Sequence, residues 1–290
     1  MWGDIQMACI RVNNLSYRYP TSGTMNLKKI NFSVEEGEFI AVIGRNGSGK
    51  TTLCNVLRGF APHFYNGEIC GEVFVNGKDV LNTDISQLVL DIGYVFQNPF
   101  TQMSGTKSTV FEEIGFGLEN VGVERDEIID RVRRIIEMLG IESIQFKSPT
   151  ELSGGQCQRV ALASVIAMEP SILVIDEPTS QLDPEGTRQV FEIIAHLKQL
   201  KKTVILIEHK IDLIAEYADR VVLMDDGKIV MDGSTYDVLT SPRMSEYNTS
   251  IPQYARLGMR LRDMGYDIGR IPMNLDEAVE VVEKLLKRGA

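Results

Sequence analysis

Four short stretches of the chain are apolar at nearly every position. They are residues 39–43, 92–96, 172–175 and 203–207. A strand that is covered on both faces has this pattern, and such strands belong to parallel sheets. Helical patterns alternate with strand patterns in the later part of the chain, so we expect an α/β fold.

Two further patterns accompany these runs. Between positions 7 and 80, short β patterns alternate with turn residues such as the pair Asn76-Gly77, which predicts an antiparallel β subdomain. Residues 98–168 are more helical, and within residues 126–139 apolar side chains recur on one helical face. We therefore expect an inserted helical subdomain at about 98–168.

The end of the chain carries two short amphipathic patterns. We expect residues 7–239 to form the main domain and residues 240–290 to form a C-terminal extension of small helices. Two short helices bury little by themselves, so their apolar faces need a surface, either on the chain's own main domain or on a partner. The apolar face of the first pattern consists of Leu257, Leu261 and Met264. The apolar face of the second consists of Ala278, Val279, Val282, Leu285 and Leu286.

The segment after the first apolar run matches the phosphate-binding pattern Gly-x-x-x-x-Gly-Lys-Ser/Thr. It extends from Gly44 to Thr51, and residues 52–57 favour a helix. Glycines let backbone N–H groups turn toward an anion, and the helix N-terminus adds the positive end of its dipole. Lys50 can reach the β- and γ-phosphates of a nucleotide, and the Thr51 hydroxyl suits Mg²⁺.

A pair of carboxylates follows another apolar run. Asp176 and Glu177 come directly after residues 172–175, and ligands of open α/β sheets bind at the carboxyl ends of strands. Asp176 is suited to hold Mg²⁺ through water, and Glu177 to orient and deprotonate a water that attacks the γ-phosphate. The two motifs together predict ATP hydrolysis.

Charge and cysteine content narrow the class of protein. The net charge of −10 argues against nonspecific nucleic-acid binding, which requires a basic surface. Four cysteines lack metal-ligand spacing, so we expect them to be reduced in a cytosolic chain. No apolar run approaches the roughly 20 residues that span a bilayer. If the protein belongs to a transporter, we expect another chain to supply the channel.

A third motif, the sequence Leu-Ser-Gly-Gly-Gln at residues 152–156, precedes a helical pattern. Its serine and glycines at a helix start form a second anion-binding end. This motif resembles the signature of the ATP-binding-cassette (ABC) ATPases residue for residue. In that family two cassettes pack head to tail, and the signature of one closes over the γ-phosphate held by the other. The resemblance implies a P-loop NTPase cassette with a RecA-like core, which needs a second cassette, identical or paralogous.

The resemblance also implies roles for residues outside the main motifs. Gln97 matches the glutamine that reaches Mg²⁺, and His209 matches the histidine that contacts the γ-phosphate. Asp183 matches the residue through which the two cassettes of the dimer communicate. Tyr19 matches the aromatic residue that stacks on adenine, with Tyr17 as the alternative on the same strand face. Departures from the family pattern are Gln181, Glu208 and Lys210. The expected nucleotide contacts are Tyr19, Gly44, Asn46, Gly47, Ser48, Gly49, Lys50, Thr51, Thr52, Ser153, Gly154, Gly155 and Gln156.

Four segments resemble the ATPases of energy-coupling-factor (ECF) importers, which take up vitamins and transition-metal ions. They are residues 96–103, residues 109–120, the triplet 208–210 and the C-terminal extension. This resemblance implies a transmembrane coupling subunit, a substrate-binding membrane subunit, and a peripheral location at the cytoplasmic face of the cell membrane. It also implies that the extension contacts the partner cassette. A conventional ABC transporter ATPase and a non-transport cassette protein acting on ribosomes or DNA are the alternatives.

Overall fold

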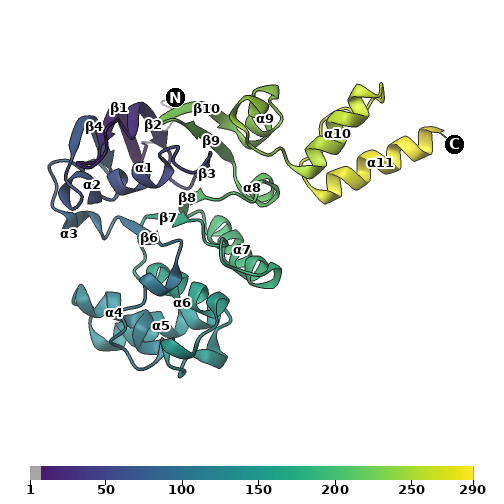
Figure 1. Cartoon of the computed structure of the whole chain (residues 1–290). Helices are drawn as coiled ribbons and strands as arrows, with labels where there is room; N and C mark the ends of the chain where they lie inside the picture. The colour runs from purple at the N-terminus through teal and green to yellow at the C-terminus, as the bar shows by residue number, and fades with distance from the viewer. Residues whose placement is uncertain (1–7, 290) are drawn as a thin grey trace, which may run out of the picture.

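The computed structural model describes residues 8–289, so Met7, where we expect the main domain to begin, lies outside the described residues. Figure 1 shows two sheets in the upper part of the molecule, a group of helices below them, and two further helices at the side. No helix among residues 8–289 is long and apolar enough to span a membrane.

The larger sheet has six strands, five of them parallel. In chain order they are β3 (Phe39–Ile43), β6 (Ile92–Val95), β7 (Ile172–Asp176), β8 (Thr203–Ile207), β9 (Arg220–Asp225) and β10 (Lys228–Ser234). They lie in the order β10-β9-β3-β8-β7-β6, with β10 as the antiparallel edge strand. Every residue of β3, β7 and β8 is buried, as expected of continuous apolar runs in a parallel sheet. The carboxyl ends of β3, β8, β7 and β6 are therefore neighbours at one edge.

The smaller sheet is antiparallel and has the order β2-β1-β4-β5. Its strands are β1 (Ile10–Arg18), β2 (Leu27–Val34), β4 (Glu68–Val75) and β5 (Lys78–Asp79). Its buried side chains form one core with Ile40 and Val42 of β3. The alternate residues of the same strand, Phe39, Ala41 and Ile43, face a second core on the other side of the larger sheet. Strand β3 thus lies between two cores, because its side chains alternate in direction.

Most residues between β6 and β7 are helical or lie in turns between helices. The elements are η1 (Pro99–Thr101), α4 (Val110–Asn120), α5 (Arg125–Met138), η2 (Glu142–Ile144), η3 (Pro149–Glu151) and α6 (Gly154–Ala167). Val132, Ile135 and Ile136 of α5 are buried, so the apolar stripe expected in residues 126–139 packs inward. Both α4 and α6 begin with a capping box, in which a Ser or Thr and the third helical residue exchange hydrogen bonds.

The remaining helices surround the sheets and form the end of the chain. They are α1 (Lys50–Leu57), α2 (Phe60–His63), α3 (Ile85–Leu88), α7 (Pro184–Gln199), α8 (Ile211–Tyr217), α9 (Thr235–Leu239), η4 (Pro242–Tyr247), α10 (Gln253–Asp263) and α11 (Leu275–Gly289). Helices α10 and α11 lie beside α8 and α9, on the side of the molecule away from β1 and β4 (Figure 1).

The C-terminal helices pack on the main domain with some apolar residues and expose others to solvent. Met244, Ala255, Ile271 and Met273 are buried in the main core, so part of the extension docks on its own chain. Other apolar side chains of the extension remain exposed. They are Leu257, Met264, Tyr266, Leu275, Val279, Val282 and Leu286. The expected contact with a partner stays a prediction.

Candidate nucleotide-binding site

The loop between β3 and α1 wraps around the amino group of Lys50. Gly44, Gly47 and Gly49 have positive φ angles of 142°, 81° and 105°. A Cβ atom on Gly44 would lie 2.1 Å from the carbonyl oxygen of Met224, so no larger residue fits there. Lys50 is 5% exposed. Its Nζ donates hydrogen bonds to the carbonyl oxygens of Gly44 (2.8 Å) and Arg45 (3.2 Å). An ammonium has three donors, so one remains for a ligand.

A polar cavity of about 310 Å³ opens over this loop. The side-chain oxygen of Ser48, inside the loop, is buried and has no hydrogen-bond partner among the described residues. Backbone amides, an ammonium and an unsatisfied hydroxyl at a helix N-terminus suit a polyphosphate. The cavity is lined by Asn26, Asn46, Gly47, Gly49, Lys50, Thr51, Thr52, Gln97 and Glu177.

Asp176 is held at the end of β7 by two hydroxyl groups. The Tyr94 hydroxyl donates to its Oδ2 at 2.6 Å and the Thr51 hydroxyl to the same atom at 3.2 Å. Burial raises the pKa of the Asp176 carboxyl above its ordinary value, and the hydrogen bonds from Tyr94 and Thr51 oppose that shift. Carboxylate and hydroxyl oxygens are the ligands that Mg²⁺ prefers, so these residues fit a magnesium ion.

Glu177 connects two more of the predicted residues. Its Oε2 accepts a hydrogen bond from Gln97 Nε2 at 2.7 Å, and its Oε1 lies 2.8 Å from His209 Nε2. The backbone of Glu177 has a φ of 45°, which is uncommon for a residue with a side chain. Such a conformation is often found at functional sites. Because Gln97 uses its amide nitrogen here, its amide oxygen remains available to a metal.

Two opposing effects act on the pKa of Lys50. Burial lowers the pKa of the Lys50 ammonium, and the nearby carboxylates of Glu177 and Asp176 oppose that shift. A triphosphate would place further negative charge beside the ammonium and favour its protonated form.

The two tyrosines near the N-terminus differ in exposure. Tyr17 is 0% exposed and donates its hydroxyl to the carbonyl oxygen of Asn66. Tyr19 is half-buried, and its hydroxyl accepts a hydrogen bond from Asn55 of α1 at 3.1 Å. Of the two rings, only Tyr19 has a surface that a base could contact. Neither ring lines the phosphate cavity.

The signature residues line a different cavity, of about 400 Å³. Ser153, Gly154, Gly155 and Gln156 share it with Asp183, whose carboxylate caps α7 by accepting from Gly186 N at 2.7 Å. A Cβ atom on Gly154 would meet none of the described residues within 4 Å, so packing among them does not require this glycine. The phosphate loop and the signature thus line two separate cavities of the chain.

Some residues of the site were not predicted. Tyr94 on Asp176 and Asn26 in the phosphate cavity have no motif of their own. Glu208 and Lys210, which depart from the family pattern, form hydrogen bonds with neighbouring threonines. Glu208 is 3% exposed and accepts hydrogen bonds from the Thr179 hydroxyl, and Lys210 Nζ donates to the hydroxyl of Thr187 on α7 at 2.7 Å. They fix the segments before and after His209.

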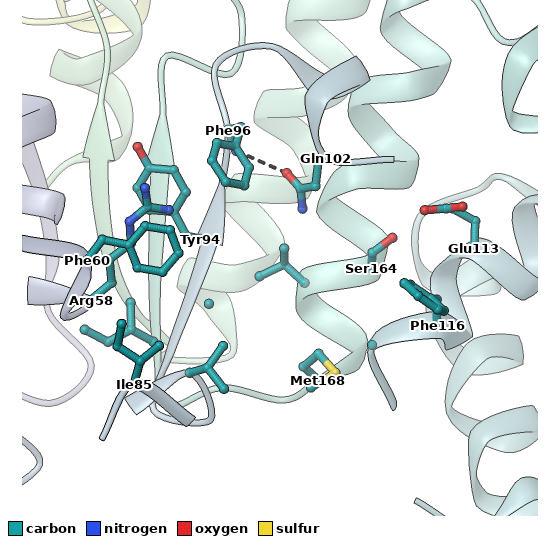
Figure 2. Close-up of a pocket in the computed structure, with 15 residues that line it drawn as sticks. Arg58, Phe60, Ile85, Tyr94, Phe96, Gln102, Glu113, Phe116, Ser164 and Met168 are labelled. Carbon is teal, nitrogen blue, oxygen red and sulfur yellow. Dashed lines mark hydrogen bonds between the residues drawn. The ribbon is translucent and has the colours of Figure 1, made fainter. Parts of the chain in front are cut away.

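An apolar groove of about 300 Å³ lies between β6 and the helices α4 and α6. Figure 2 shows Arg58 and Tyr94 on the strand side and Glu113 on the helical side. Its two charged side chains, Arg58 and Glu113, are 8% and 4% exposed. Within residues 8–289 neither forms an ion pair.

The sequence profile of the ABC transporter family matches residues 27–180, more than half of the chain. The chain belongs to the ABC transporter ATPases. Nucleotide binding, with Mg²⁺ as the usual partner, and ATP hydrolysis coupled to transport are characteristic of this family. The two sheets and the inserted helices are the ABC cassette fold, so the fold predicted from the sequence is confirmed.

Three known proteins illustrate the relationship. The energy-coupling factor transporter ATP-binding protein EcfA2 of Acetivibrio thermocellus is 38% identical over 96% of this chain and 99% of its own. The structure of CbiO1 from Clostridium perfringens, part of the ABC transporter complex CbiONQ, has a TM-score of 0.73 and 31% identity. That similarity covers 89% of this ABC ATPase and 97% of CbiO1. An ATP-binding cassette solved as a dimer with ADP and phosphate has a TM-score of 0.68 and 26% identity, over 78% and 98% of the two chains.

Proposed function

We propose that this ABC ATPase powers an ECF-type membrane importer for a vitamin or a transition-metal ion. The observation that carries the proposal is the 38% identity with EcfA2 over nearly all of both chains, C-terminal extension included. The similarity to CbiO1 supports the same type of complex. In this proposal the chain lies at the cytoplasmic face of the cell membrane.

We assign the chemistry to the residues around the phosphate cavity. Lys50 binds the β- and γ-phosphates, and Tyr19 stacks on adenine. Thr51, Gln97 and Asp176 would hold Mg²⁺, which would neutralise phosphate charge when bound. Glu177 takes a proton from the attacking water, whose oxygen bonds to the γ-phosphorus as the bond to the ADP oxygen breaks. His209 orients Glu177 and contacts the γ-phosphate.

The second half of each ATP site comes, in this proposal, from a second cassette. The signature and the phosphate loop line separate cavities, which supports their use by two different nucleotides. Among residues 8–289 nothing fills the space beside Gly154, which suits a ligand approaching from outside. The second cassette is identical or paralogous, and Asp183 lies where the two would communicate.

We also assign the parts of the chain that meet other proteins. Residues 7–239 form the cassette, with the helical subdomain at about 98–168, and residues 240–290 contact the partner cassette. The apolar groove receives a helix of the transmembrane coupling subunit. Buried charges of both signs, Arg58 and Glu113, would recognise polar groups on that helix. A separate membrane subunit binds the transported substrate.

Isolation of the protein from native membranes tests the type of transporter. We expect the tagged chain to copurify with a small transmembrane subunit, a substrate-binding membrane subunit and a second cassette, identified by mass spectrometry. Copurification with a periplasmic or lipid-anchored binding protein would favour a conventional ABC importer. Sedimentation with ribosomes in place of membranes would contradict transport. A Lys50→Ala variant serves as a control, because assembly without nucleotide does not need Lys50.

A further inference from the structure

One side chain belongs both to the nucleotide site and to the apolar groove. Tyr94 lies on β6 opposite Val174 of β7, so its hydroxyl reaches Asp176 Oδ2 at 2.6 Å. Its ring lines the groove (Figure 2). Any change in the position of this ring therefore moves a hydrogen bond to Asp176.

The Tyr94 ring is itself held in place by Arg58. The guanidinium carbon lies 3.9 Å from the centroids of both the Tyr94 and the Phe60 rings. Its Nε and Nη2 donate to Asn55 Oδ1 at 3.1 and 2.7 Å. Arg58 also lines the groove and forms no ion pair within residues 8–289.

This arrangement is unusual for a buried charge. A buried guanidinium is costly unless it is paired, and here an amide oxygen and aromatic faces replace the carboxylate. Arginine suits this role because its planar group stacks on rings, which lysine does less well. The residue therefore fixes the orientation of Tyr94 with a planar contact rather than with a salt bridge.

We propose that Tyr94 and Arg58 are positioning residues for the metal-binding carboxylate. Tyr94 holds Asp176 through its hydroxyl, and Arg58 fixes the Tyr94 ring from the wall of the groove. Because Oδ2 accepts from Tyr94 and Thr51, the other oxygen of Asp176 is left for the metal or its water. A helix seated in the groove would touch both positioning residues and so alter metal binding. The inference rests on the proposed role of Asp176 in holding Mg²⁺.

Metal affinity, rather than turnover, tests the inference. Mn²⁺ is titrated into the full chain in the presence of a non-hydrolysable ATP analogue, and free Mn²⁺ is followed by electron paramagnetic resonance. Loss of a hydrogen bond to a metal-binding group costs about tenfold or more in affinity, so we expect Tyr94→Phe to bind Mn²⁺ about tenfold more weakly. Arg58→Lys should give a smaller loss of about threefold, because lysine keeps the charge but loses the stacking.

The double variant tests the link between the two residues. If Arg58 acts through the Tyr94 hydroxyl, the double variant binds Mn²⁺ no more weakly than Tyr94→Phe alone, whereas independent effects would multiply. Two variants serve as matched controls. Tyr236→Phe removes a hydroxyl that contacts Ile271 of the extension, and Val89→Ala changes an exposed residue of the groove. Both should bind Mn²⁺ like the wild type.

An Asp176→Asn variant separates failure of this inference from failure of the proposed function. If Asp176→Asn loses Mn²⁺ affinity while Tyr94→Phe retains it, the positioning role is wrong and the metal site stands. If Asp176→Asn also retains it, the assignment of Asp176 is wrong, and the inference fails with it. Multiplying losses in the double variant would contradict the route through Tyr94.

Discussion

At the scale of single residues, the arrangement around Glu177 supports the proposed role of its carboxylate as a base. Gln97 and His209 contact its two oxygens, and its side chain is 15% exposed at the mouth of the phosphate cavity. These contacts hold the carboxylate in one direction. A group placed in this way needs little reorganisation during the reaction.

The change Glu177→Gln should therefore separate binding from hydrolysis. The amide can still contact Gln97 or His209 but is a very poor base, so we expect ATP hydrolysis to fall about a hundredfold or more. ATP affinity should stay close to that of the wild type. Steady-state phosphate release and nucleotide titration measure the two quantities. Turnover within a few fold of the wild type would assign the base to another residue.

Motif residues could be predicted from the sequence because each motif follows a strand whose carboxyl end lies at the same edge. The loop at Gly44, the pair Asp176-Glu177 and His209 are examples. The contact of Tyr94 with Asp176 could not be predicted in this way. It depends on the pairing of β6 with β7, and strands that are far apart in the chain give no pairwise signal in one sequence.

At the scale of elements, the geometry at the N-terminus of α6 supports the proposed contact with a second cassette. Ser153 and Gln156 exchange hydrogen bonds in the capping box, which leaves other N–H groups of the first turn without a helical partner. A Cβ atom on Gly154 would meet none of the described residues within 4 Å, and one on Gly155 would lie 3.8 Å from the Cα atom of Gly186. This end of the helix can therefore accept an anion from another molecule.

The variant Ser153→Arg should bind ATP but fail to hydrolyse it. Its phosphate loop is intact and lies in another cavity, while the bulky side chain would block the approach of a second cassette. Equilibrium dialysis with ATP and a phosphate-release assay give the two readouts. The substitution Ser143→Arg, in the same subdomain but outside the signature cavity, is a suitable control. Loss of ATP binding in Ser153→Arg would mean that one chain uses both motifs.

The positions of the helices along the chain were easier to predict than the surfaces against which they pack. The helix expected at residues 126–139 is α5 (Arg125–Met138), and those expected in the extension are α10 and α11. Their burial differs from a single-stripe pattern, because Ala255 and Gly258 of α10 pack inward while Leu257 stays exposed. Helical periodicity gives the face but not the surface that covers it.

At the scale of the whole molecule, the extension has one docked side and one open side. Ile271 and Met273 join the main core, and the Ile271 N–H donates to the Tyr236 hydroxyl. Val279 and Val282 of α11 are 47% and 38% exposed. Deleting residues after Leu239 would remove core residues together with the open side, so point substitutions on α11 are the sharper test.

We predict that Val282→Asp weakens self-association of the nucleotide-free protein and leaves ATP binding unchanged. A charge in an apolar contact costs more than the contact supplies, so dimer dissociation should become at least about tenfold easier. Analytical ultracentrifugation measures the association constant. Glu280→Ala, a change at an exposed polar residue of the same helix, is the control. Equal association constants for wild type and Val282→Asp would mean that the extension packs only on its own chain.

The claim that two chains share each ATP site is tested most directly by mixing two inactive variants. Lys50→Ala should lose tight ATP binding, because the charged contact to phosphate is gone, and Ser153→Arg should not hydrolyse ATP. In a mixed dimer, one site carries both changes and the other carries neither. Random mixing at equal amounts makes half of the dimers mixed, so about a quarter of wild-type hydrolysis should return. If native mass spectrometry detects mixed dimers and no activity returns at any ratio, the two chains do not share their sites.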